Sequence, residues 1–312
     1  DFENEMKLKY EGKEDDIVQL LEGGNISFPL PLSLIQGTQS LFGAKTKLKF
    51  GNLTLDAVVS QQKSESSSVT VQGGAQMDEF NFKADQYDAN RHFFISQYFY
   101  DNYNNAMSTL PIINSNIVIT KIEVWRTNVG AAVTNNRNIV AFSDLGEAKP
   151  YGQNPSIERP GAGALPDQNL SNRLLDVVDV NSLRNINTIS SYLQGMGFVS
   201  GQNYEKVESA RKLSSNEYTF NPKLGFISLT TPLSADQVLA VAFRYQIVGD
   251  TATYQVGEFS DEGVSDPNTL VVKLLKSSSL NVRNPIWKLM MKNVYRIPDA
   301  YQISEEDFRL NI

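Results

Sequence analysis

The residues that could carry chemistry are sparse in this sequence. The single histidine, His92, lies in the segment NRHFFIS, where we expect a helix to start. A zinc site or a histidine-based catalytic triad would need partners that this chain lacks, because it has no second histidine and no cysteine. We therefore interpret His92 as a residue at a helix end or at an interface.

Acidic residues cluster at four places, namely Asp15/Asp16, Asp85/Asp88, the segment SDEGVSDPN and Glu305/Glu306/Asp307. None of them follows the order of a calcium-binding loop, so we interpret Asp261, Glu262 and Asp266 as a solvated turn, with an adventitious calcium ion as the weaker alternative. With 35 acidic residues, no single carboxylate pair stands out as that of a glycosidase.

Sequence motifs of enzymes are missing as well. The chain has no nucleophile elbow, no phosphate-binding loop and no dinucleotide fingerprint, since GAGAL lacks both the final glycine and a preceding strand. We therefore expect no enzyme activity, no catalytic residue, no cofactor and no bound metal.

Composition describes a chain with enough apolar residues for a real core. Of the 312 residues, 41% are hydrophobic and 20% are charged, and the formal net charge is -7. The densest basic stretch is the alternating Lys45/Lys47/Lys49, which is too short to follow a phosphate backbone, so no nucleic acid partner is expected. No apolar run approaches the roughly 20 residues of a membrane helix. The first and last residues look like cuts, so we expect a piece of a longer protein.

Residues 37–62 alternate between apolar and polar side chains on both sides of Gly51-Asn52. Leu48 and Phe50 point one way while the three lysines point the other, and Leu53 and Leu55 begin a second alternating run. This pattern predicts a β-hairpin. It fits both an apolar face packed on a core and a transmembrane hairpin facing lipid.

The pattern along the chain predicts an α+β fold of mostly antiparallel strands and hairpins with a few packed helices. We divide the chain into four regions: 1–75, a β-hairpin region with strands like those of a barrel; 76–150, an αβ unit; 151–200, a Gly/Pro-rich loop and a helix; and 201–312, a β-meander with a C-terminal helix. Strands are also predicted at 7–10, 67–72, 116–128 with a bulge, 137–142, 217–220, 225–229, 237–249, 253–259 and 269–276. The segment 137–142 is predicted to neighbour 116–128.

Three helices are predicted. The first, capped by Asp88 or Asn90, runs through FFISQYFYDNYNNAM; the second lies between Val180 and Leu193; the third begins at Asn284 with Pro285 at its first position and continues to Arg296. Ser304 to Asp307 is a possible cap for one further turn.

The aromatic residues of the first helix cover too much of its surface for one buried face. They fit a helix packed between two layers and equally a contact surface for a partner. The Gly/Pro-rich loop at 145–172 is the second exposed segment that we consider a candidate for contact with a partner. The predicted partner contacts are Phe93, Phe94, Tyr98, Tyr100, Tyr103, Asn154 and Pro160.

Several separated blocks resemble the SprA family, called Sov in some species, of gliding-motility and secretion proteins from the Bacteroidetes. The blocks, in order, are QSLFGAKTKLKFGNLTLDAVVSQQKSES, FFISQYFYDNYNNAMSTLP, ITKIEVWRTN, YQVGEFSDEG, LVVKLLK and NPIWKLMMKNVY. The resemblance extends from about Glu22 to the last residue.

The resemblance implies a non-catalytic role in protein export and gliding. Members of the family are large outer-membrane β-barrel proteins that form the translocation pore of the type IX secretion system, with sizeable soluble insertions. The implied partners are the remainder of the barrel protein, accessory outer-membrane and periplasmic secretion components, and exported protein cargo. The implied location is the cell envelope, at the outer membrane, with this segment in an aqueous compartment at the periplasm or the cell surface.

Two hairpins cannot close a barrel, and an open sheet edge is costly in lipid. We therefore predict that the hairpin at 37–62 packs on the folded remainder of the chain, which acts as a cap, gate or docking segment of the pore. The alternatives are an envelope carbohydrate-binding or adhesin-like β domain, disfavoured because the richest aromatic stretch is predicted helical, and a hydrolase with an acidic cleft.

Overall fold

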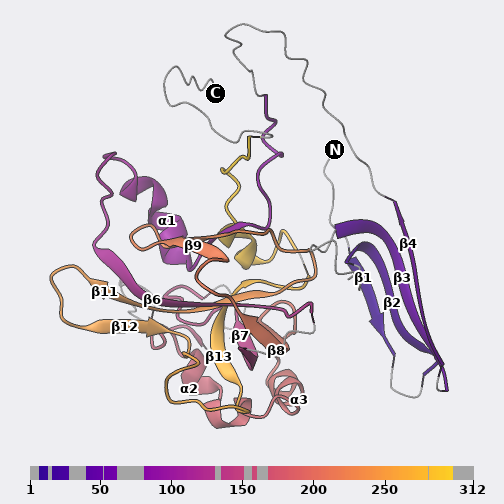
Figure 1. Ribbon diagram of the computed structural model, residues 1–312. Coiled ribbons are helices and arrows are strands. Elements are labelled where there is room, and N and C mark those ends of the chain that lie inside the picture. Colours follow the sequence, from indigo (N-terminus) through magenta and orange to yellow (C-terminus); the bar gives the residue numbers. More distant parts are fainter. Residues whose placement is uncertain are drawn as a thin grey trace, which may run out of the picture.

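The computed structural model describes residues 7–12, 16–27, 40–51, 53–61, 81–130, 135–150, 157–159, 168–279 and 281–297. Most of the regular structure is β-strand, with a few short helices, as the sequence predicts. The strands form, among others, a four-stranded N-terminal sheet. Figure 1 shows this sheet beside a larger folded part. We call the described residues from 81 to 297 the body.

The N-terminal sheet is antiparallel throughout, in the order β1-β2-β3-β4. Its strands are β1 (Lys7–Glu11), β2 (Val18–Ser27), β3 (Ser40–Phe50) and β4 (Leu53–Gln61). A tight turn joins β3 to β4, and Gly51 adopts a φ of +62° there, which a glycine tolerates without a steric penalty. The hairpin predicted over 37–62 is confirmed, with Phe50 directly opposite Leu53.

The prediction that this hairpin packs on the rest of the chain is wrong. Among the described residues, the buried core runs from Phe93 to Met291 and takes none of its members from β1–β4. The apolar side chains of the sheet remain exposed, as at Leu53 (66%) and Val59 (77%). A period of two identifies the apolar face of a strand, but it does not reveal what that face contacts.

The body is built around a six-stranded sheet in the order β12-β11-β13-β7-β8-β6. Its strands are β6 (Ile117–Arg126), β7 (Asn136–Phe142), β8 (Tyr204–Lys212), β11 (Leu239–Ile247), β12 (Thr253–Val256) and β13 (Leu270–Lys276). Because β11 also pairs with β6, the sheet closes on itself. Strands from both ends of the body therefore share one core.

Details of this sheet confirm some predictions and correct others. The bulge predicted in the first strand of the body sheet is present, because the β6–β11 register shifts between Arg244 and Tyr245. The hairpin of β11 and β12 is confirmed. The expectation that β7 neighbours β6 is wrong, since β8 lies between them and β7 pairs in parallel with β13. The predicted meander is also interrupted, because β9 and β10 belong to another sheet.

A small second sheet has the order β5-β10-β9, with β5 (His92–Phe94), β9 (Tyr218–Asn221) and β10 (Phe226–Leu229). The hairpin predicted around Asn221-Pro222-Lys223 is confirmed by the pairing of β9 with β10. The Asn221 side chain accepts hydrogen bonds from the backbone N–H groups of Lys223 and Leu224, which fixes the turn.

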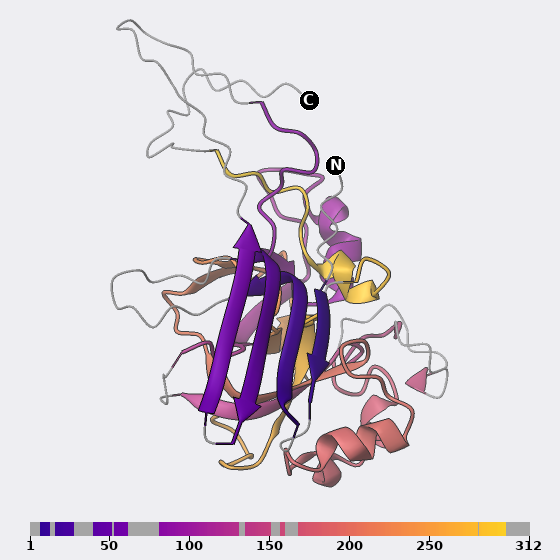
Figure 2. The ribbon, with the colours of Figure 1, turned by 90° about the vertical axis from the view of Figure 1, so that its right-hand side faces the viewer.

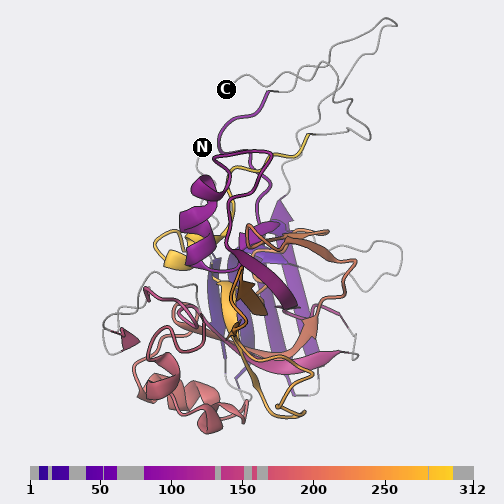
Figure 3. The same cartoon turned by 90° about the vertical axis from the view of Figure 1, so that its left-hand side faces the viewer.

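The helices are shorter than predicted. They are α1 (Gln97–Ala106), α2 (Leu174–Val177), η2 (Val180–Leu183), α3 (Ile189–Gly195) and η3 (Pro285–Leu289). The first helix begins after Ser96, because His92 to Phe94 pair with β10 as a strand. The predicted helix over 180–193 is two separate pieces, and the helix capped by Asn284 ends after one 3₁₀ segment. Figure 3 shows α1 and η3 side by side on the body.

Gly225 allows α1 to approach the β9–β10 hairpin. Its φ is +61°, and an added Cβ would lie 2.1 Å from ring atoms of Phe99, which is buried in α1. We expect Gly225→Ala to lower the free energy of unfolding by about 1–3 kcal/mol because it overpacks this contact. Gly249→Ala is the control, since Gly249 has a φ of +88° with nothing within 4 Å. Equal losses in urea unfolding of the two variants would contradict the packing argument.

Two predicted elements and two predicted contacts lie outside the described residues. They are the strand at 67–72, the turn at 304–307, Asn154 and Pro160.

Candidate functional site

One face of the N-terminal sheet carries apolar side chains that remain in contact with solvent. The register sets Leu48 opposite Leu55, Phe50 opposite Leu53, and Tyr10 opposite Leu21, so these side chains share a face. We call this surface the apolar sheet face; its members are Leu8, Tyr10, Leu21, Ala44, Thr46, Leu48, Phe50, Leu53, Leu55, Ala57 and Val59, of which Thr46 alone is polar. Figure 2 shows the four strands in front of the body. A contiguous exposed apolar surface of this kind marks an interaction site.

The opposite face of the same sheet is charged and its charges are paired. Glu22 lies between Lys9 and Lys45 on the two neighbouring strands, and Lys47 lies opposite Asp56. Opposite charges directly across two strands stabilise the pairing. We call this surface the charged sheet face; its members are Lys9, Glu11, Leu20, Glu22, Lys45, Lys47, Lys49, Thr54, Asp56 and Val58. The sheet thus presents one apolar and one water-compatible surface.

The fold buries some of the aromatic side chains that were predicted to contact a partner and leaves others accessible. Phe93 and Phe94 are 1% and 4% exposed, so neither has surface to offer a partner. Tyr103 is half-buried, with its ring 5.2 Å from that of Phe94 in an edge-to-face arrangement, and Tyr98 is half-buried against Phe99. Tyr100 is 41% exposed, so it stays a predicted contact.

His92 lies in a row of three side chains that the sequence did not reveal. Its Nδ1 is 2.8 Å from the Ser228 Oγ, and its Nε2 is 3.3 Å from a carboxylate oxygen of Asp88. Ser228 lies in β10, which pairs on both sides, and the next backbone N–H, that of Leu229, donates to the Arg91 carbonyl. Because that N–H is engaged, it cannot stabilise an oxyanion. The row therefore fastens β5 to β10.

The acidic segment SDEGVSDPN is held by cations of the body. Lys121 Nζ donates to Asp261 and Glu262 at 2.7 and 2.8 Å, and the Arg244 guanidinium also donates to Glu262. Both cations lie over the ring of Phe259, at 4.3 and 5.0 Å from its centroid. Since these two carboxylates are already neutralised, the turn is a folded ion-pair network. No group of acids in the described residues is arranged to hold a metal ion.

This network gives stability a pH dependence. Hydrogen bonds from Arg244, and then from Lys121, lower the pKa of Glu262 from 4.5 to about 2. The ionised Glu262 side chain makes its full contribution to the free energy of unfolding above pH 4.5, the pKa of this group in the unfolded state. The contribution is lost as the pH falls towards 2, because the unfolded state binds the proton first. We expect wild type to lose more stability between pH 5 and pH 3 than Glu262→Gln does. If the urea midpoints of wild type and Glu262→Gln fall equally between pH 5 and pH 3, Glu262 is not the source of this pH dependence.

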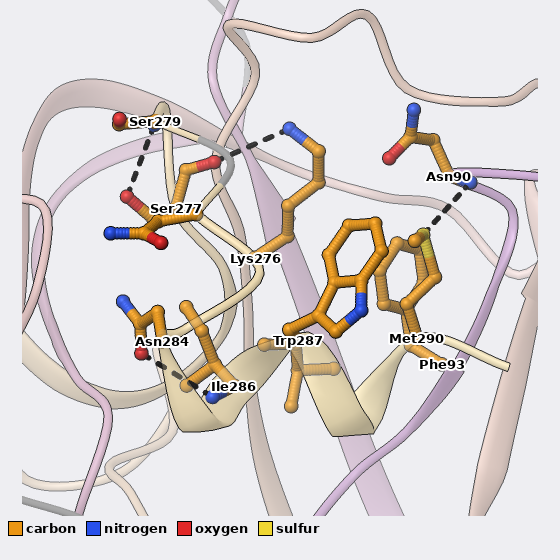
Figure 4. A pocket seen from close by; sticks show the side chains of 11 residues that line it. Asn90, Phe93, Lys276, Ser277, Ser279, Asn284, Ile286, Trp287 and Met290 are labelled. Carbon is orange, nitrogen blue, oxygen red and sulfur yellow. Dashed lines mark hydrogen bonds between the residues drawn. The ribbon is translucent and has the colours of Figure 1, made fainter. Parts of the chain in front are cut away.

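A cavity of about 20 Å³ lies between the end of β13 and η3. Figure 4 shows Asn90, Lys276 and Trp287 around it. The Lys276 Nζ donates to the carbonyls of Ala235 and Gln237 at 2.7 and 2.8 Å, so its charge is already solvated by backbone. This volume is that of one water molecule.

A buried ion pair crosses the core of the body. Lys273 of β13 and Glu147, after β7, are 0% and 1% exposed, with 2.5 Å between the ammonium and carboxylate. Glu147 also accepts from the backbone N–H of Gln97, at the start of α1. The pair thus joins the closed sheet to α1. A charged residue in the apolar run TLVVKLLK signals a buried partner.

Among the helices in the described part of the chain, none has the length and hydropathy needed to span a bilayer.

A family model matches the N-terminal part of the chain. The family SprA_N, described as "Motility related/secretion protein", matches residues 1–137, which include the whole N-terminal sheet, α1 and β6. A search of the curated proteins finds no match. The match indicates a function related to motility and secretion. Residues 1–137 of this chain are thus similar to the SprA family of motility-related and secretion proteins.

Proposed function

We propose that this chain is a non-catalytic part of the outer-membrane translocation pore of the type IX secretion system. In this proposal β1–β4 form part of the wall of the larger β-barrel, and the body is the cap over the passage. Its partners are the remainder of the pore protein, accessory outer-membrane and periplasmic components, and the exported protein cargo.

The observation that carries the proposal is the contrast between the two faces of the N-terminal sheet. Strands of a pore wall alternate between apolar side chains towards lipid and polar side chains towards a watery interior. The apolar sheet face and the charged sheet face follow this alternation on β3 and β4. Strands β2, β3 and β4 have 10, 11 and 9 residues, close to the 9–11 of tilted strands that cross a bilayer.

The connections between these strands favour one orientation. At one end of the sheet the strands follow each other closely, because β1 ends at Glu11 and β2 begins at Val18, and β3 ends at Phe50 and β4 begins at Leu53. At the other end more of the sequence intervenes, because β2 ends at Ser27 and β3 begins at Ser40, and the described body begins at residue 81 after β4 ends at Gln61. Outer-membrane strands have short periplasmic turns and longer extracellular loops. Since the body follows β4 through one of the long connections, this asymmetry supports a body on the cell-surface side.

Single-cysteine labelling of the full-length protein in intact cells tests this proposal. Thr251, exposed at the β11–β12 turn, reports on the body, and Ile17, 58% exposed, reports on the end with short turns. A membrane-impermeant maleimide is expected to label Thr251→Cys in intact cells, and to label Ile17→Cys only after the outer membrane is opened. The opposite pattern would contradict the orientation, and labelling of both sites in intact cells would contradict the membrane-spanning sheet.

A further inference from the structure

Two arginines face each other across neighbouring strands of the body sheet. Arg126 is the last residue of β6, and the register with β8 sets it directly opposite Arg211 (Figure 1). Like charges directly opposite each other on two strands destabilise the pairing. The next pair along does not relieve this repulsion, because it sets Lys212 opposite Trp125. Folding of the sheet alone therefore gives no reason for two cations at this position.

The carboxylate nearest to the two arginines in the described part of the chain belongs to Glu217, in the turn between β8 and β9. Both of its oxygens accept hydrogen bonds from the Arg211 guanidinium, one of them at 3.0 Å. The backbone N–H and the hydroxyl of Ser214 also donate to it, at 3.0 and 2.7 Å. These hydrogen bonds, with those of Arg211 the largest cause, lower the pKa of Glu217 from 4.5 to about 2. The carboxylate is therefore ionised and already paired with Arg211.

The Arg126 guanidinium is left without a matching carboxylate. Its Nη2 lies 4.0 Å from Oε1 of Glu217, beyond hydrogen-bond distance, and its Nε is buried with no acceptor among the described residues. Burial, and then the charge of Arg211, lower the pKa of Arg126 below its ordinary 12.5. Residues 127–135, which follow it in the sequence, include no acidic residue. The two arginines and Glu217 thus carry one net positive charge.

The other cation at this end of the two strands has partners of its own. Lys212 Nζ donates to the carboxylate of Glu123 at 3.1 Å and to the hydroxyl of Ser260 at 2.9 Å. The excess positive charge therefore lies at Arg126. Because 23% of the Arg126 side chain is exposed, a ligand can reach the guanidinium without unfolding of the body.

We propose that Arg126 anchors a carboxylate-binding site, which takes a side-chain or C-terminal carboxylate of a peptide segment. A guanidinium offers parallel N–H donors that match the two oxygens of a carboxylate. One bound carboxylate cancels the single net charge of the site, whereas a phosphate group with nearly two negative charges exceeds it and lies beside the ionised Glu217. The site belongs to the body and does not rest on the pore function proposed above.

Peptide binding to the full chain tests the site, with the arginine Nε–H resonances of isotope-labelled protein as the readout. One short probe peptide has a central glutamate and an amidated C-terminus, a second has no acid and a free C-terminus, and a third has neither carboxylate. We expect wild type to bind the first or the second peptide, and the one that binds identifies the kind of carboxylate. Arg126→Lys is expected to bind it at least about tenfold more weakly, because lysine keeps the charge but loses the paired donors.

The matched control is Arg159→Gln, which removes a guanidinium paired with Asp176 at 2.8 Å and is expected to bind as wild type does. Binding of neither carboxylate peptide above the third, or equal affinity in wild type and Arg126→Lys, would overturn the proposal. The cysteine-labelling pattern in cells is independent of this assay, so the two proposals can fail separately.

The stability of the protein without ligand gives a second readout. A residue that serves binding and not folding is expected to cost stability when its ligand is absent. Arg126→Gln removes a buried charge and its repulsion from Arg211, so we expect the thermal midpoint to be unchanged or higher by up to about 2 °C. Arg211→Gln, which deprives Glu217 of its donor, is expected to lower the midpoint. A lower midpoint in Arg126→Gln would show that this guanidinium supports the fold, which contradicts the proposed role.

Discussion

Replacing Lys273 with Met is expected to lower the free energy of unfolding of the body by about 3–5 kcal/mol. The substitution leaves the Glu147 carboxylate buried beside an apolar chain, with the Gln97 N–H still donating to it. The loss of the cation is costly because water cannot replace it at a site that is 1% exposed. Denaturant unfolding followed by the near-ultraviolet signal of the tryptophans measures the change.

Two further variants separate the charge effect from the loss of packing. Adding Glu147→Leu to Lys273→Met is expected to recover part of the stability, because the unpaired carboxylate is removed. Lys206→Met breaks an ion pair with Glu208, which is 61% exposed, and is expected to cost less than about 1 kcal/mol. A double variant that is less stable than Lys273→Met alone, or a loss of stability in Lys206→Met as large as that in Lys273→Met, would contradict the charge effect.

The second large effect is expected in the N-terminal sheet. Ala57→Lys places a charge in the middle of β4 on the apolar sheet face. If this face contacts lipid, the substitution opposes membrane insertion by about 2–4 kcal/mol. We expect a marked loss of full-length protein from the outer-membrane fraction and of secreted cargo from the medium. Quantitative blots of both fractions measure these losses.

The neighbouring residue provides the control. Val58→Lys introduces the same side chain one position later, on the charged sheet face opposite Lys45. A like-charge pair in water costs less than about 1 kcal/mol, so insertion and secretion are expected to remain close to wild type. Equal losses in the two variants would show that the sheet tolerates no lysine on either side, which contradicts a lipid-facing surface.

Local patterns in the sequence were sufficient to predict most strands. The alternation on either side of Gly51 predicts β3 and β4, and Asn221-Pro222 predicts the turn between β9 and β10. Both depend on residues close together in the chain. The bulge in β6 was also predictable, because its apolar residues depart from a period of two.

The structural features that the sequence did not predict depend on contacts between residues far apart in the chain. Phe93 and Phe94 fit a helical pattern, but pairing with β10, more than a hundred residues later, makes them a strand. Lys273 signals a buried partner, yet nothing local identifies Glu147 among 35 acidic residues. The segment from Met290 to Arg296 was likewise predicted to be helical, but its backbone forms hydrogen bonds with His92 and Asp88, which lie far earlier in the chain.

The residues of the candidate site were predicted from the sequence, but their exposure to solvent was not. The alternating side chains of 44–59 were identified, but period two is the same for a face on a core and for a face towards lipid. The exposure of Leu53, Leu55 and Val59 shows that this face does not pack on the core of the described residues, and that exposure depends on where the core of the body closes. Closure of the six-stranded sheet on itself leaves the N-terminal sheet outside that core.

The most direct test of the account is residue-by-residue quenching along β4. Single cysteines at positions 53 to 59 of the full-length protein, in outer-membrane vesicles, carry an environment-sensitive fluorophore that is challenged with lipid-attached and with water-soluble quenchers. We predict lipid quenching at Leu53, Leu55, Ala57 and Val59, alternating with aqueous quenching at Thr54, Asp56 and Val58. Aqueous quenching at all seven positions would contradict the proposal that this sheet is part of the pore wall.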